Sequence, residues 1–139
     1  MSHEVSGNLR DDGILDIAIR GDHDPGLILD MILEVVKLAR QPGVKCLLID
    51  IRELRGRASF SESYFNIRSI PADSPRLKTA VLELPEHIEK GVFFDTAAGN
   101  MGFTVKHFIH EGDALSWLAQ GTANADETPR ADAPATTIR

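Results

Sequence analysis

Serine and arginine side chains gather in one short stretch near the middle of the chain, which reads RGRASFSESY. A serine hydroxyl can carry a phosphoryl group or attack a substrate when a base activates it, and a guanidinium binds carboxylates and phosphates through paired N–H groups. Arg52, Arg55 and Arg57 precede Ser59 and Ser61 here. The stretch therefore has three interpretations: the start of a helix, an anion or phosphoserine site, and a catalytic serine.

The helix start has the clearest signature of the three. Ser59-Phe60-Ser61-Glu62 fits S-x-x-E, the capping box, in which the serine hydroxyl and the glutamate carboxylate each bond the other's backbone N–H. The same helix end has free N–H groups and a partial positive charge, so it also favours an anion, and the upstream arginines would add charge-assisted donors. A catalytic serine is the least favoured interpretation, because the chain has no G-x-S-x-G elbow and no histidine adjacent in sequence that would serve as the base for the serine.

Histidines and carboxylates elsewhere are weaker candidates. Asp22, His23 and Asp24 could bind a metal or perform acid–base chemistry. Asp24 is better explained as a helix cap, however, and Asp22-His23 as solvated turn residues. Three further histidines are His87, His107 and His110. Their spacing matches no H-E-x-x-H or related motif, so we expect them to be structural or solvated and expect no metal and no cofactor.

The composition narrows the classes of function. The chain has 139 residues, 42% of them hydrophobic, which suits one domain with its own core. A net charge of −6 argues against a nucleic-acid module and against a polybasic membrane binder. The single cysteine, Cys46, lies in an apolar run and is expected to be a buried thiol. No apolar run approaches membrane-spanning length and no signal-peptide core opens the chain, so we expect a cytoplasmic protein.

Strand and helix patterns alternate along the sequence. Strands are predicted over 14–21, 44–51, 78–84 and 103–109, and helices over 24–41, 59–70, 85–100 and 111–120. A short first strand precedes them, with Asp12-Gly13 as a hairpin turn. The predicted order is β-β-α-β-α-β-α-β-α, which implies a mostly parallel sheet with an antiparallel edge. The domain is expected over 1–120, followed by a disordered tail over 121–139 that has almost no large apolar residue.

Apolar spacing predicts which helix faces are buried. In the helix after Ser59, Tyr64, Phe65, Ile67 and Ile70 are expected mostly in the core, although Phe60 and Tyr64 could instead form an exposed contact stripe. In the helix over 85–100, one inward side is predicted. Its members are Ile88, Val92, Phe93 and Ala97. Phe93, Phe94 and Trp117 are expected to be core residues.

The element order and three segments resemble the SpoIIAA-like branch of the STAS superfamily, which includes anti-sigma-factor antagonists and cytosolic domains of some anion transporters. The segments are CLLIDIREL, FFDTAAGNMGFTVKHF and EGDALSWL, and the resemblance covers roughly residues 5–119. It implies a STAS-like α/β fold, and the closer match is to small stand-alone members. In the antagonists, a kinase phosphorylates a serine at the start of the helix after the central strand. That position falls on Ser59, with Ser61 second, although the Asp-Ser-Ser-Gly-Leu pattern of the antagonists is absent.

Topology predicts a shared rim for several candidate residues. Open parallel sheets bind ligands at the carboxyl ends of their strands, and the loops at 21–24, 52–59, 85–87 and 110–112 all follow strands. The predicted rim consists of Asp22, His23, Arg55, Ser59, His87 and His110.

The function expected from these observations is that of a non-enzymatic SpoIIAA-like, STAS-type regulatory or binding domain. It would bind a protein partner or a small anionic or lipid-like ligand at the rim, and phosphorylation of Ser59 or Ser61 would switch it. The alternative is a small hydrolase or transferase that uses a rim carboxylate and histidine. A homodimer formed through an edge strand is also plausible for so small a sheet.

Overall fold

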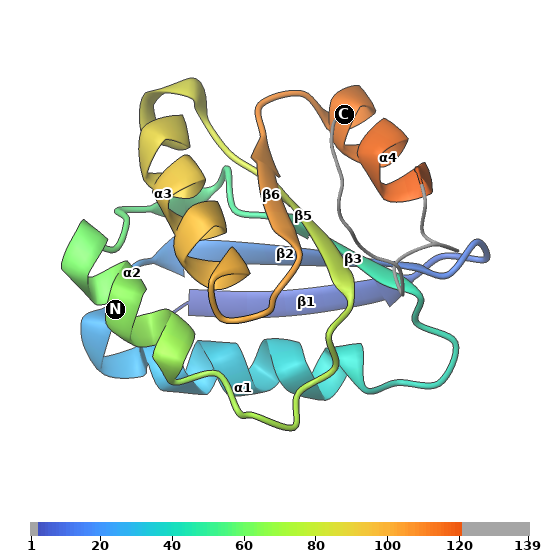
Figure 1. Cartoon of the computed structure of the whole chain (residues 1–139), viewed down its shortest axis with the longest axis horizontal. Helices are drawn as coiled ribbons and strands as arrows, with labels where there is room; N and C mark the ends of the chain where they lie inside the picture. Colours follow the sequence, from blue (N-terminus) through green and yellow to red (C-terminus); the bar gives the residue numbers. More distant parts are fainter. Residues whose placement is uncertain (1–2, 121–139) are drawn as a thin grey trace.

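A mostly parallel sheet separates two unequal layers of helices in the computed structural model, which describes residues 3–120 (Figure 1). The strands are β1 (His3–Leu9), β2 (Ile14–Asp22), β3 (Cys46–Asp50), β4 (Leu54–Arg55), β5 (Lys78–Leu82) and β6 (Val105–Phe108). The helices are α1 (Ile28–Ala39), α2 (Phe60–Arg68), α3 (Ile88–Gly99) and α4 (Glu111–Ala119). Short 3-10 turns, Pro25–Leu27 and Pro85–His87, lead into α1 and α3. The predicted disordered tail lies outside the described residues.

The sheet has the order β1-β2-β3-β5-β6. β1 pairs antiparallel with β2 through a turn that closes at Gly13, whose φ of 91° favours glycine, and β2, β3, β5 and β6 run parallel. The predicted antiparallel edge is therefore confirmed. The sequence pattern missed β4, which pairs with the end of β2, because two residues are too few to show a strand period.

Side chains on the two faces of the sheet form two separate cores. On one face, Leu15, Ile17 and Leu47 pack with α1. On the other, Leu48 and Leu82 pack with α4. β3 contributes alternate residues to both cores, which confirms that this strand is covered on both sides. Cys46 is 4% exposed in the second core, and this burial raises the pKa of its thiol, as expected of a structural cysteine.

Local caps start the helices where the sequence predicts them. The side chain of Asp24 accepts a hydrogen bond from the N–H of Gly26 at 2.9 Å, and the first turn after it is 3-10 rather than α-helical. At α2, the Ser59 hydroxyl accepts from the N–H of Glu62 at 3.1 Å, and the Glu62 carboxylate accepts from the N–H of Ser59 at 2.7 Å. The predicted capping box is confirmed.

The predicted buried faces of two helices need correction. In α2, Tyr64 and Phe65 are 43% and 64% exposed, and the residues that point inward are Ser63 and Ile67. In α3, Val92 is 55% exposed. The buried side of α3 instead carries the small residues Gly91 and Ala98, which no hydrophobicity count would select.

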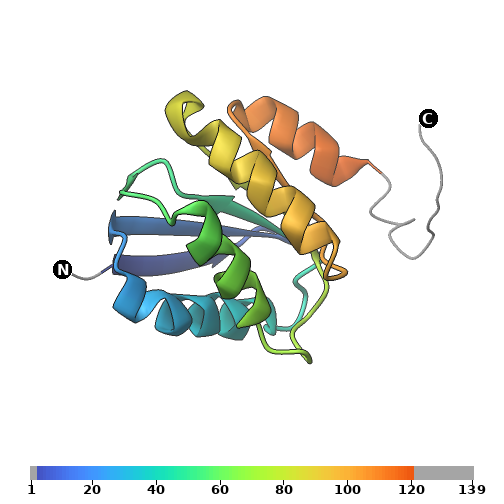
Figure 2. The ribbon, with the colours of Figure 1, turned by 60° about the vertical axis from the view of Figure 1, so that its left-hand side comes forward.

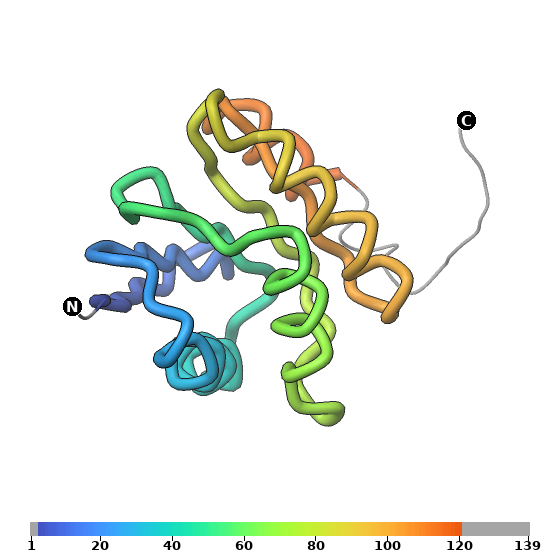
Figure 3. The backbone as a smooth tube through the Cα atoms, turned by 90° about the vertical axis from the view of Figure 1, so that its left-hand side faces the viewer, coloured from blue at the N-terminus to red at the C-terminus, as the bar shows by residue number. Residues whose placement is uncertain are grey.

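The helices on the α1 face leave the middle of the sheet without direct helix cover. α1 packs along β1, α3 packs along β6, and α2 packs mainly against α3. Figures 2 and 3 show α2 lying between α1 and α3. Within residues 3–120, no helix is long and apolar enough to cross a membrane.

Candidate functional site

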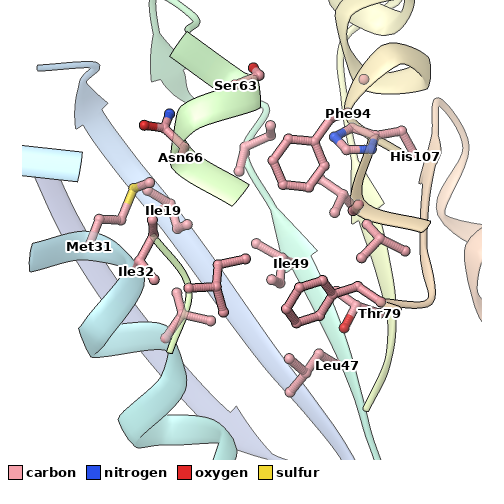
Figure 4. A pocket seen from close by; sticks show the side chains of 18 of the residues that line it. Ile19, Met31, Ile32, Leu47, Ile49, Ser63, Asn66, Thr79, Phe94 and His107 are labelled. Atoms are coloured by element: carbon pink, nitrogen blue, oxygen red, sulfur yellow. The ribbon is translucent and has the colours of Figure 1, made fainter. Parts of the chain in front are cut away.

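A cavity of about 280 Å³ lies over the middle of the sheet, between α1 and α3 (Figure 4). Its floor consists of residues from parallel strands, namely Ile19, Leu47, Ile49, Thr79, Val81 and Val105. Met31, Ile32 and Val35 of α1 form one wall, and Phe94 of α3 belongs to the other. Ser63 and Asn66 of α2 border the opening between the two walls.

The cavity exists because the helices bring small or polar residues to positions that usually hold large apolar ones. α2 presents Ser63 and Asn66 to it, while its aromatic side chains face solvent. α3 presents Ala98, whereas the imidazole of His107 fills the space beside Gly91. Close packing is the rule for protein interiors, and voids much larger than a water molecule are few. A space of this size lined mostly by Ile, Val, Leu and Phe is therefore a candidate site for an apolar molecule.

A buried ion pair forms one end of the cavity. The Arg57 guanidinium donates from Nε and Nη2 to the two carboxylate oxygens of Glu83, at 2.9 and 2.7 Å. It also donates to the carbonyl oxygens of Ile51, Leu54 and Gly56. The side chains are only 7% and 2% exposed, and every N–H direction of the guanidinium has an acceptor. The pair therefore organises the loop from β3 to α2.

His107 borders the same cavity from β6. Its Nδ1 lies 2.7 Å from Oδ1 of Asp95 on α3, and its backbone N–H donates to Oδ2 of the same carboxylate at 2.8 Å. The imidazole packs so closely against Gly91 that a Cβ there would lie 2.5 Å from its Cδ2. The Phe94 ring is edge-on to the imidazole at 5.8 Å. These contacts hold α3 against β6 and orient the histidine.

Two polar atoms that border the cavity have no hydrogen-bond partner in the described part of the chain. They are Nε2 of His23 and Oγ of Ser74, both fully buried. The nearest acid to the histidine is Glu62, with 3.6 Å between Nε2 and Oε1. Buried donors and acceptors are usually paired, so these two atoms are available to a bound molecule.

The predicted arginines are each bound to a different carboxylate. Arg52 forms a two-bond pair with Asp50, and this contact lowers the pKa of that carboxyl. Arg55 donates to Asp22 at 2.7 Å and likewise lowers the pKa of that carboxyl. The buried Arg57 is bound to Glu83, so each of the three arginines has a carboxylate partner within the chain. Their role in binding an external anion stays a prediction.

The remaining predicted rim residues all follow the carboxyl ends of strands. Ser59 caps α2, and its hydroxyl lies 3.3 Å from that of Ser61. His87 and His110 immediately precede α3 and α4, without a side-chain cap bond. Only His23 and Arg57 among the predicted site residues border the cavity, as does His107, which the sequence suggested was structural. Glu83, Asn66 and Lys90 were not predicted, because no motif or spacing marks them.

Neither a serine or cysteine bonded to a histidine nor a metal-binding cluster is present in the described residues. No serine or cysteine side chain between residues 3 and 120 is hydrogen-bonded to a histidine. The same part of the chain has no group of three or more His, Cys, Asp or Glu residues that could hold a metal ion.

Comparison with solved structures defines the fold class. An uncharacterised protein with a SpoIIAA-like fold from Shewanella loihica PV-4 aligns with a TM-score of 0.52 and 20% identity, covering 84% of this chain and 94% of that one. An anti-sigma factor antagonist from Mycobacterium paratuberculosis aligns with a TM-score of 0.48 and 15% identity, with the same coverage. No family model matches the chain, and no curated protein is significantly similar in sequence. The fold is SpoIIAA-like, as the sequence resemblance predicted.

Proposed function

We propose that this protein is a non-enzymatic binding domain of regulatory type that holds a small molecule with an apolar body in the cavity between α1 and α3. The observation that carries the proposal is the cavity itself, because its apolar floor and walls come from six separate elements of the fold. Excluding water from such a surface favours association with an apolar ligand. The unpartnered Nε2 of His23 adds a polar contact that would orient the ligand.

Filling the cavity tests this proposal. Ile32 on α1 borders the cavity, whereas Leu33, the next residue, is 45% exposed on the outer surface. Ile32→Phe should occupy part of the space and weaken binding of octan-1-ol, measured by isothermal titration calorimetry, at least tenfold. Leu33→Phe adds the same ring to the outer surface and should leave binding unchanged. Absence of any octan-1-ol binding to the natural protein would refute the proposal.

A protein partner is a second candidate, favoured by the outer face of α2. Phe60, Tyr64 and Phe65 are 45%, 43% and 64% exposed there, and large exposed aromatics are enriched at interfaces. Because Ser63 and Asn66 of the same helix border the cavity, a ligand beneath α2 would affect the surface that a partner contacts. Phe65→Ser should reduce capture of a partner from a lysate of the source cells, whereas Leu29→Ser on α1 should not.

Phosphorylation of Ser59 or Ser61 would be a regulatory addition to this function. Both serines are exposed at the start of α2, Ser59 as its N-cap and Ser61 in its first turn, where the helix end favours negative charge. A phosphoryl group on Ser59 would also compete with Glu62 within the capping box. Mass spectrometry of the protein isolated from its source cells would detect the modification, and complete absence of phosphate under all growth conditions would argue against the switch.

A further inference from the structure

Two exposed arginines have no carboxylate partner within residues 3–120. This part of the chain has eight arginines, and six of them form an ion pair with an aspartate or a glutamate. The other two are Arg68, the last residue of α2, and Arg76, in the segment before β5, and both are exposed. Acidic residues outnumber basic ones in this chain, so a shortage of acids does not explain why these two are unpaired.

Both arginines lie against the turn that follows α3. Nη1 of Arg68 is 3.9 Å from the sulfur of Met101. The guanidinium carbon of Arg76 is 3.8 Å from the centroid of the Phe103 ring. Met101 and Phe103 are two residues apart, and their backbone N–H groups both donate to the carbonyl oxygen of Ala98. The two guanidiniums therefore share one surface, near the carboxyl-terminal ends of α2 and α3.

Aromatic and apolar side chains surround these charges. Arg68 lies over the Tyr64 ring, 4.6 Å from its centroid, and donates to the Tyr64 hydroxyl at 2.7 Å. Tyr64 and Met101 are 43% and 40% exposed. A ring covers one face of a guanidinium and leaves its N–H edge open, and Arg76 donates no hydrogen bond within residues 3–120. We call this surface the arginine patch, which consists of Tyr64, Arg68, Arg76, Met101 and Phe103.

We propose that the arginine patch binds an acidic segment of a protein partner, in which carboxylates flank an apolar residue. This inference rests on the second candidate function, a protein partner at α2, and specifies the chemistry of that partner. Each free guanidinium can take one carboxylate through paired N–H groups. The acid nearest in sequence, Asp73, is bound to Arg40 at 3.2 Å and so does not occupy either position.

The composition of the patch favours a protein over a nucleic acid. Arginine, tyrosine, phenylalanine and methionine are enriched at protein interfaces, and arginine and tyrosine contribute most to binding energy there. A nucleic-acid backbone needs a broad basic field, whereas this chain has a net charge of −6.

Peptide titrations of the full chain test the preference for acid. The probe is the hexapeptide Glu-Glu-Leu-Phe-Glu-Glu, blocked at both ends, and its matched control is Gln-Gln-Leu-Phe-Gln-Gln. Nuclear magnetic resonance of the isotope-labelled protein measures both affinities from the amide chemical shifts. The acidic peptide should bind at least about tenfold more tightly, because charge-assisted hydrogen bonds add roughly that factor. The shifts should centre on residues 99–104, and added salt should weaken only the acidic peptide.

Substitutions assign the preference to the two arginines. Arg68→Gln and Arg76→Gln should each weaken binding of the acidic peptide about threefold, and the double variant should bind both peptides equally. The matched control is Arg20→Gln, on β2, because it removes the same charge from an exposed arginine that is paired with Glu53. This control should leave both affinities unchanged.

The outcomes separate this inference from the function on which it rests. Equal affinity of the two peptides refutes an acidic partner but leaves the aromatic face of α2, tested by Phe65→Ser, as a partner surface. Tighter binding of a thymidine oligonucleotide than of the acidic peptide would assign the patch to nucleic acid and refute the inference. No binding of the acidic peptide up to about 10 mM would also refute it. If the double variant does not fold, the comparison of the two peptides on the natural protein decides the question.

Discussion

Breaking the buried Arg57–Glu83 pair is the perturbation with the largest expected effect on stability. Glu83→Leu would leave a guanidinium that is 7% exposed without its carboxylate, and would remove the acceptor of the Leu84 N–H. Arg57→Met would leave a buried carboxylate and free the three carbonyl oxygens that hold the loop from β3 to α2.

The expected loss of stability is large because both charged side chains are buried. Removing one member of a buried ion pair costs about 3–5 kcal/mol, because the other charge stays desolvated. This is a large part of a domain's total stability of about 5–15 kcal/mol. The double variant Arg57→Met/Glu83→Leu has no unpaired charge and keeps similar side-chain volume. Its cost should fall short of the sum of the two single costs by about 2–3 kcal/mol, within the range seen for residues in contact.

Urea denaturation, followed by the fluorescence of Trp117, the only tryptophan, measures the free energy of unfolding. The four proteins to compare are the natural protein, the two single variants and the double variant. A matched control is Arg55→Met. That side chain is 71% exposed and also pairs with a carboxylate, so its loss should cost far less than the loss of either member of the buried pair. The reasoning would be refuted if either single variant of the buried pair lost less than about 1 kcal/mol of unfolding free energy. It would also be refuted if the loss in the double variant equalled the sum of the two single losses.

Further predictions concern α3, the α2 cap and acid stability. Gly91→Ala should destabilise the protein by about 1–3 kcal/mol, because its Cβ would lie 2.5 Å from the imidazole packed against it. Gly99→Ala on the same helix meets nothing within 4 Å and should be neutral or stabilising by up to about 1 kcal/mol, and urea denaturation of both glycine variants measures the difference. Ser59→Ala should cost about 1 kcal/mol in urea denaturation, whereas Ser59→Asp, which keeps a capping oxygen, should cost almost nothing; equal losses would contradict the cap. Arg52 lowers the pKa of Asp50 in the folded state, so the stability from this pair is present above the unfolded pKa of about 4 and lost as pH falls through the lower folded value. Asp50→Asn should therefore flatten the dependence of stability on pH below about 4, and an unchanged slope would contradict the assignment.

Much of the fold was predictable because the signals are local. The alternation of apolar and polar residues in β2, the continuous apolar run of β3 and the caps Asp24 and Ser59 each depend on a few neighbouring residues. Helix positions within the layers were less predictable. Val92 has the spacing of a core residue, yet it faces solvent, because α3 turns its small residues toward β6 so that His107 can fit beside Gly91.

For the candidate site, the sequence by itself determined which loops follow the carboxyl ends of the parallel strands, and hence that His23 and Arg57 lie at one end of the sheet. Only the tertiary structure decided what surrounds them. Arg57 and Glu83 are 26 residues apart in sequence and pair because β5 lies beside β3. The cavity likewise depends on the separation of α1 from α3 and on the inward turn of Ser63 and Asn66. A void is a property of how elements pack together, and no local pattern of residues encodes it.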